Sequence, residues 1–121
     1  MAKIMAVDDE PDILSLIKKI LERAGHQVIT CISGKEFLQK FRMEKPDLVL
    51  LDVMMPEMDG WDVYREIRKI NRNQKVAFLT ALDVPPRIKE GIKQFGAMDY
   101  ISKPFEPDEL VKKIDGFLAK K

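Results

Sequence analysis

Five short apolar runs alternate with five segments of helical periodicity along this chain of 121 residues. The runs are Ile4 to Val7, Val28 to Ile32, Leu48 to Leu51, Val76 to Leu79 and Tyr100 to Ile101, and most are rich in the branched residues that strands favour. Because the connections are short, the alternation predicts one doubly wound α/β domain over residues 1–121, with a parallel sheet covered by helices on both faces.

The helical segments carry start and stop signals. The first ends at Gly25, and the second opens with a Ser-x-x-Glu capping box at Ser33 and precedes Pro46. A third helix is expected from about Trp61 to Ile70. Pro85–Pro86 and Pro107 suit the starts of a fourth and a fifth helix.

Composition excludes several classes of protein. Lysine plus arginine number 21 against 20 aspartate plus glutamate, a net charge of +1, so direct nucleic-acid binding is not expected. Cys31 is the only cysteine, which excludes a disulfide framework and fits a reducing compartment. No apolar stretch reaches the roughly 18 residues that span a bilayer and no secretory signal is evident, so we expect a cytoplasmic protein with no membrane partner.

Polar residues follow four of the five predicted strands. They are Asp8, Asp9 and Glu10, then Asp52, then Thr80, and finally Lys103 with Pro104. The carboxyl ends of parallel strands meet at one edge of a sheet, so these side chains are expected to converge. Clustered carboxylates favour a hard cation such as Mg²⁺, and a lysine with a hydroxyl supplies donors for a phosphoryl group.

Each of these residues taken alone has a simpler explanation. Asp8 or Asp9 could cap a helix, Asp52 could begin a turn, Thr80 could be an ordinary strand residue, and Lys103 could be a solvated surface lysine. Only their predicted convergence at one edge favours a functional site.

Four segments together resemble the receiver domain of two-component response regulators. Ala6–Pro11 is similar to the family's acidic pair, Leu50–Gly60 to its phosphoacceptor segment, and Leu79–Ala81 to its switch hydroxyl, while Gly96–Phe105 completes the pattern. The resemblance covers the whole chain. It implies a flavodoxin-like fold with strand order 2-1-3-4-5 and five helices.

The resemblance also implies the chemistry of the site. Asp52 would be the nucleophile that accepts a phosphoryl group. Asp9, Asp52 and the backbone carbonyl of Met54 would ligate Mg²⁺, for which Mn²⁺ could substitute, and Asp8 would hold metal-bound water. The chain would thus be a phosphoacceptor signalling module rather than an enzyme with a separate substrate.

A second set of residues would respond to phosphorylation. Lys103 would contact the phosphoryl oxygens. The Lys103–Pro104 peptide bond would be cis, which would direct the lysine side chain toward the pocket. Thr80 would move to donate a hydrogen bond, and Tyr100 would rotate inward. The surface of the fourth helix, fifth strand and fifth helix would change as a result.

Partners follow from the same resemblance. A sensor histidine kinase or a histidine phosphotransfer protein would supply the phosphoryl group, and a downstream protein or a fused output domain would read the changed surface. The protein would be a monomer or a phosphorylation-dependent dimer.

Two expectations come from individual side chains. Leu14 lies at the edge of the apolar stripe of the first helix, which is formed by Ile13, Leu16, Ile17, Ile20, Leu21 and Ala24. At this edge Leu14 would be exposed and would contact the kinase partner. A role at the edge of the core is equally consistent with its position. Met54 and Leu82 flank the site with apolar side chains that would hinder the attacking water, which predicts a long-lived phosphoryl group.

Three other classes of protein are consistent with parts of the pattern. An aspartate-nucleophile phosphatase should have Asp-x-Asp, but this chain has Asp52-Val53-Met54. A nucleotide or flavin binder would need a phosphate loop where Asp8, Asp9 and Glu10 stand. A receiver-like scaffold that acts without phosphorylation stays open.

Overall fold

The computed structural model describes residues 2–81, 90 and 99–120. Within these residues the elements are β1 (Lys3–Val7), α1 (Pro11–Arg23), β2 (Gln27–Cys31), α2 (Gly34–Glu44), β3 (Leu48–Asp52), α3 (Gly60–Ile70), β4 (Val76–Ala81), β5 (Asp99–Lys103) and α5 (Pro107–Ala119). The predicted fourth helix, which begins at Pro85–Pro86, lies outside the described residues. Strands and helices alternate elsewhere as predicted.

The five strands form one parallel sheet in the order β2-β1-β3-β4-β5. This confirms the strand order that the family resemblance implied. The register pairs Val7 with both Cys31 and Leu51 and pairs Thr80 with Ser102. The strands therefore end nearly level, and the residues that follow them share one edge of the sheet.

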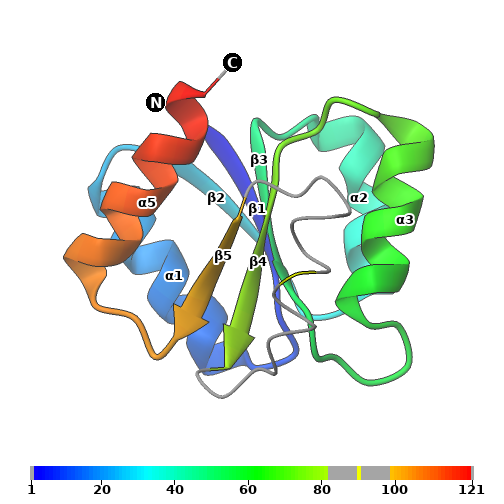
Figure 1. The fold of residues 1–121 in the computed structure, drawn as a ribbon, viewed down its shortest axis with the longest axis horizontal. Helices are drawn as coiled ribbons and strands as arrows, with labels where there is room; N and C mark the ends of the chain where they lie inside the picture. Colours follow the sequence, from blue (N-terminus) through cyan, green and yellow to red (C-terminus); the bar gives the residue numbers. More distant parts are fainter. Residues whose placement is uncertain (1, 82–89, 91–98, 121) are drawn as a thin grey trace.

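Helices cover both faces of the sheet, with α1 and α5 on one side and α2 and α3 on the other (Figure 1). Alternate strand residues supply the two halves of the core: Met5 and Val49 join the α2 and α3 side, whereas Ile4 and Leu48 join the α1 and α5 side. Both faces of each central strand are buried, which explains the nearly continuous apolar runs. None of the helices in the described ranges is long and apolar enough to cross a bilayer.

The stripe of α1 that packs on the sheet includes Ile17 and Leu21 as predicted, but it differs from the prediction at Leu14 and Leu16. Leu14 is 3% exposed and belongs to the core with Ile17 and Leu21, whereas Leu16 is 43% exposed. Leu14, Ile17 and Leu21 follow the i, i+3, i+7 spacing of the buried stripe. The structure shows the core alternative for Leu14, so the expectation that it is exposed is wrong and the partner contact that depended on it is withdrawn.

The capping box predicted for α2 forms only in part. The Ser33 hydroxyl accepts a hydrogen bond from the backbone N–H of Glu36 at 3.1 Å, as the motif predicts. The Glu36 carboxylate instead accepts the N–H of Ile32 at 3.2 Å, one residue before the cap. The start of α2 is thereby tied to the segment that follows β2.

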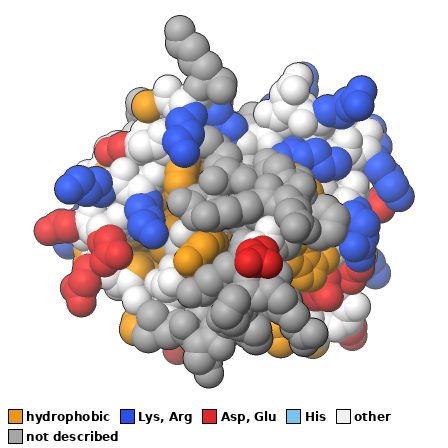
Figure 2. All heavy atoms as spheres, viewed as in Figure 1, with side chains coloured by type: hydrophobic (Ala, Val, Ile, Leu, Met, Phe, Trp, Pro, Cys, Tyr) orange, Lys and Arg blue, Asp and Glu red, His pale blue; other side chains and the backbone are white. Residues whose placement is uncertain are grey.

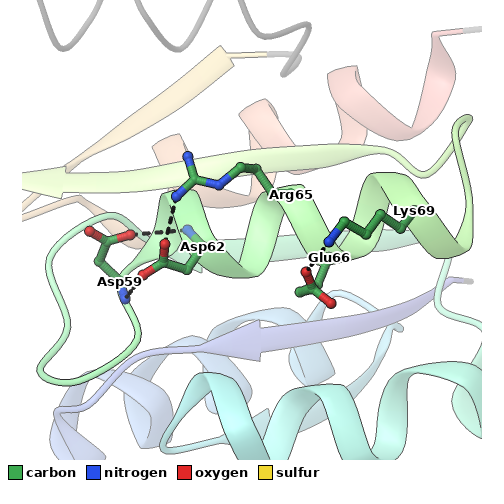
Figure 3. Close-up of polar contacts among 5 residues, drawn as sticks. All are labelled: Asp59, Asp62, Arg65, Glu66 and Lys69. Carbon is green, nitrogen blue, oxygen red and sulfur yellow. Dashed lines mark hydrogen bonds and ion pairs between the residues drawn. The ribbon is translucent and has the colours of Figure 1, made fainter.

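A complete capping box starts α3 at Asp59. The Asp59 side chain accepts the N–H of Asp62 at 3.0 Å, and the Asp62 side chain accepts the N–H of Asp59 at 3.2 Å (Figure 3). Asp62 also pairs with Arg65 at 2.6 Å, and Glu66 pairs with Lys69 one turn farther along the helix (Figure 3). The capping box fixes the residue at which α3 begins, and the two ion pairs lie along its first turns.

Gly60 brings the first turn of α3 against the end of β3. Its N–H donates to the carbonyl of Val53 at 3.0 Å. A Cβ at this position would lie 2.5 Å from the carbonyl oxygen of Asp52 and 2.8 Å from the Cα of Val53. Both atoms are backbone, so a larger residue cannot be accommodated by moving a side chain.

We therefore expect Gly60→Ala to destabilise the protein by about 2 kcal/mol or more, because the new methyl group displaces backbone. Gly116→Ala is the matched control, because Gly116 lies in α5 and a Cβ added there would meet nothing within 4 Å. It should stabilise the protein by about 0.5–1 kcal/mol through higher helix propensity. Urea unfolding of both variants tests the pair, and a Gly60→Ala protein as stable as the original would contradict the close approach.

Candidate functional site

The residues predicted to converge lie at the carboxyl edge of the sheet. Asp52 is the last residue of β3 and Lys103 the last of β5, while Asp8 directly follows β1 and Thr80 lies near the end of β4. The arrowheads of β4 and β5 in Figure 1 point to this edge. Loops that follow parallel strands are the usual place for ligand sites in such sheets.

Lys103 joins the two buried aspartates. Its Nζ lies 2.7 Å from Asp8 Oδ2 and 3.4 Å from Asp52 Oδ2, and 3.9 Å from Glu10 Oε1. The shortest of these contacts is a charge-assisted hydrogen bond to Asp8. One ammonium group thus lies among three carboxylates contributed by β3 and by the segment between β1 and α1.

Burial makes the negative charge on Asp52 unfavourable. Asp8 is 0% exposed and Asp52 is 4% exposed. Loss of solvation, together with the charge of Asp8, raises the pKa of Asp52 to about 7, although Lys103 and the N–H of Met54 act in the opposite direction. The single lysine does not fully compensate the two carboxylates.

The same charges act on Lys103 in the opposite sense. Burial favours its neutral form, but the hydrogen bond to Asp8 and the charge of Asp52 outweigh burial and raise the pKa of the ammonium group. Lys103 therefore stays charged at neutral pH and is a fixed cation beside Asp52.

Backbone N–H groups orient both aspartates. Asp8 Oδ1 accepts the N–H of Glu10 at 2.9 Å, and Asp52 Oδ1 accepts the N–H of Met54 at 3.1 Å. In each case the carboxylate bonds to the residue two positions ahead, a local turn that begins where the strand ends. The second oxygen of each carboxylate then faces Lys103.

The acidic residues provide suitable oxygen ligands for a hard cation. Carboxylate oxygens of Asp8, Asp9 and Glu10 all lie within 4.8 Å of one another. Oxygen ligands at this density, beside a buried carboxylate whose charge is unfavourable, fit Mg²⁺. Glu10 was not among the predicted ligands, although its place in the acidic run after β1 could have indicated it.

Thr80 is buried without a hydrogen-bond partner. Its side chain is at the carboxyl edge, it is 1% exposed, and no partner for Oγ1 lies among the residues that the structure describes. A buried hydroxyl in this state is unfavourable by about 1–3 kcal/mol. An acceptor that entered the site within reach of Thr80 would remove this penalty.

Two further predicted features can be placed. Tyr100 on β5 is partly buried against the α2 and α3 side of the core. Tyr100 pairs with Phe78 on β4, and Thr80 lies two residues after Phe78 on the same strand. Because residues two apart on a strand share a face, Thr80 and Tyr100 lie on the same face of the sheet. The Lys103–Pro104 peptide bond is cis, as expected.

Of the two apolar residues predicted to flank the site, only Met54 can be placed. Its side chain is 75% exposed, while its backbone N–H bonds Asp52. Leu82 lies outside the described residues. The side chain of Met54 therefore lies at the solvent side of the segment that follows β3.

Comparison with known proteins gives consistent matches over almost the whole chain. The chain is 41% identical over 118 residues to the Bacillus subtilis alkaline phosphatase synthesis transcriptional regulatory protein PhoP, covering 98% of this chain and 49% of that protein. It is 36% identical to the chemotaxis protein CheY of Thermotoga maritima, covering 93% of this chain and 94% of CheY. The chain spans about half the length of the transcriptional regulators it matches.

Solved structures and a family profile agree with these relatives. The chemotaxis protein CheY4 of Vibrio cholerae superposes with a TM-score of 0.90 at 31% identity, covering 97% of this chain and 98% of CheY4. The profile of the response regulator receiver domain matches residues 4–115. The chain therefore belongs to the receiver domain family of two-component response regulators.

Proposed function

We propose that Asp52 accepts a phosphoryl group from a phosphohistidine on a sensor kinase or a histidine phosphotransfer protein. The observation that carries the proposal is the placement of the buried Asp52 beside Lys103, whose ammonium group also contacts Asp8 and Glu10 of the acidic cluster at the carboxyl edge. Membership of the receiver family supports the same assignment.

The transfer exchanges one bond to phosphorus for another. A carboxylate oxygen of Asp52 forms a new O–P bond while the N–P bond to the partner's imidazole breaks, leaving an acyl phosphate and a free histidine. Lys103 Nζ, already 3.4 Å from Asp52 Oδ2, is positioned to stabilise charge on the phosphoryl oxygens. The Met54 N–H holds the other carboxylate oxygen and limits rotation of the side chain.

The acidic residues would hold the metal. Asp8, Asp9, Asp52 and the carbonyl of Met54 are the proposed set for Mg²⁺ or Mn²⁺, with Glu10 close enough to Asp8 and Asp9 to contribute. When bound, a divalent cation neutralises negative charge on the phosphoryl group and the carboxylates. This chain's own residues then need to provide only the nucleophile, Lys103 and Thr80.

Thr80 and Tyr100 would convert the new group into a changed surface. The buried hydroxyl of Thr80 gains an acceptor when a phosphoryl oxygen lies in the site. Because Tyr100 lies on the same face of the sheet, movement of Thr80 alters the space available to the aromatic ring. Phosphorylation would thereby favour one of two arrangements of the surface around β5 and α5.

The reader of this surface would be either a fused output domain or a separate protein. The first alternative fits relatives named as transcriptional regulators, and the second fits relatives named as chemotaxis proteins. A direct contact of this domain with nucleic acid or membrane is not proposed.

Incubation with Mg²⁺ and acetyl phosphate should add one phosphoryl group, detected by intact mass. The adduct should be absent in Asp52→Asn, because the nucleophile is missing, and absent with chelator, because the site's negative charge is then uncompensated. Asp47→Asn is the matched control, since Asp47 lies at the opposite edge of the sheet before β3, and it should be labelled normally. A protein that binds Mg²⁺ without any adduct would favour the phosphorylation-independent scaffold.

The exposed Met54 should slow loss of the phosphoryl group, because an apolar side chain does not orient an attacking water. Met54→Asn should shorten the half-life of the phosphorylated protein by roughly tenfold, equivalent to about one well-placed hydrogen bond in the transition state. Met43→Asn is the control, because Met43 is also exposed but lies in α2. Equal half-lives in the two variants would show that Met54 does not set the lifetime.

A further inference from the structure

A cavity of about 420 Å³ lies between the carboxyl ends of α2 and α3, at the edge of the sheet opposite Asp52. The segments leading into β3 and β4 meet there (Figure 1). Phe41, Pro46 and Ile70 supply apolar lining, and Arg42, Lys45 and Gln74 supply polar lining. The volume falls within the range of about 300–1,000 Å³ that is typical of small-molecule sites.

The described lining of this cavity includes two cations and no acidic side chain. Arg42 and Lys45 are exposed, and their side chains make no ion pair or hydrogen bond within the described ranges. The two nearest acidic residues in the sequence are already engaged by Lys3: its Nζ lies 3.2 Å from Glu44 Oε1, and its backbone N–H donates to Asp47 at 2.8 Å. Figure 2 shows Lys and Arg side chains over the α2 and α3 side of the molecule, as well as over the α1 and α5 side.

Lys45 occupies a backbone position that favours glycine. It is the C-cap of α2, with φ of 47° in the left-handed region. Glycine is the residue most often found in this conformation at helix ends, because a Cβ makes the conformation less favourable. A lysine here carries a backbone cost, and within the described ranges its side chain has no structural partner that would offset it.

The floor of the cavity is fixed before any ligand binds. Gln74 is 6% exposed, and its Nε2 donates to the carbonyl of Lys75 at 3.2 Å. Arg68 donates to the carbonyl of Gln74 at 2.7 Å and to the hydroxyl of Tyr64 at 3.0 Å. A site with a rigid floor loses little conformational entropy on binding.

We propose that this cavity binds a small aromatic carboxylate. The carboxylate lies between Lys45 and Arg42, and the ring packs against the apolar lining formed by Phe41, Pro46 and Ile70. An anion can accept charge-assisted hydrogen bonds from the two cations, which a neutral ligand cannot do as strongly, and an aromatic body adds contact with the apolar lining. The site is separate from Asp52, so the inference does not depend on the proposed function.

Titration of the intact protein with benzoate, followed by amide chemical shifts in ¹⁵N-labelled protein, tests the proposal. We expect saturable shifts at Lys45, Ile70 and Gln74, and much weaker ones with benzyl alcohol or acetate. Lys45→Gly and Arg42→Gln should each weaken benzoate binding roughly tenfold, because each substitution removes one charge-assisted hydrogen bond to the carboxylate. Arg72→Gln is the matched control. Arg72 is an exposed cation in the connection between α3 and β4, which also carries the lining residue Gln74, but Arg72 itself does not line the cavity.

A stability measurement separates a ligand role from a structural one. Lys45→Gly should raise the melting temperature by about 2–4 °C, because glycine relieves the left-handed backbone, while it weakens benzoate binding. Absence of saturable binding to the original protein would overturn the proposal. So would binding that is unchanged in Lys45→Gly, or that is weakened equally in Arg72→Gln.

Discussion

The contact of one lysine with two buried aspartates is the constraint on which the site depends. Lys103 lies 2.7 Å from Asp8 and 3.4 Å from Asp52, in a place where both carboxylates are almost fully removed from water. Two such carboxylates repel each other, and one ammonium group leaves net negative charge. A divalent cation bound at the site would offset this net negative charge.

The fold supplies the energy that holds these charges together. Parallel pairing makes β1, β3, β4 and β5 end at one edge, and two apolar core layers fix the strands from both faces. The close approach of Gly60 to Asp52 and its hydrogen bond to the carbonyl of Val53 hold the start of α3 against the end of β3, so the segment after Asp52 has little freedom. Stability elsewhere in the domain therefore compensates for unfavourable electrostatics at the site.

The apolar runs in the sequence predicted the positions of the strands. They also predicted that Asp8, Asp52, Thr80 and Lys103 lie at one edge of the sheet, because the carboxyl ends of parallel strands share an edge. They did not predict which face of α1 is buried: Leu16 and Leu14 are both apolar, and only packing on the sheet and α5 distinguishes them. The Asp59 capping box was missed because its partner is Asp62 rather than the usual glutamate or glutamine. Glu10 directly follows Asp8 and Asp9 and could have been considered with them, but its distance from their carboxylates comes only from the structure.

Urea unfolding of Asp52→Asn tests the central claim that the native fold holds Asp52 against unfavourable burial and repulsion. In EDTA near neutral pH, the variant should be more stable than the original protein by about 1–3 kcal/mol, because an amide has no charge to desolvate. Mg²⁺ should stabilise the original protein and narrow the difference, and Asp9→Asn, at an exposed carboxylate, should change stability much less. An Asp52→Asn protein that is less stable than the original in EDTA would show that the ion pair with Lys103 outweighs these costs, and it would contradict the account.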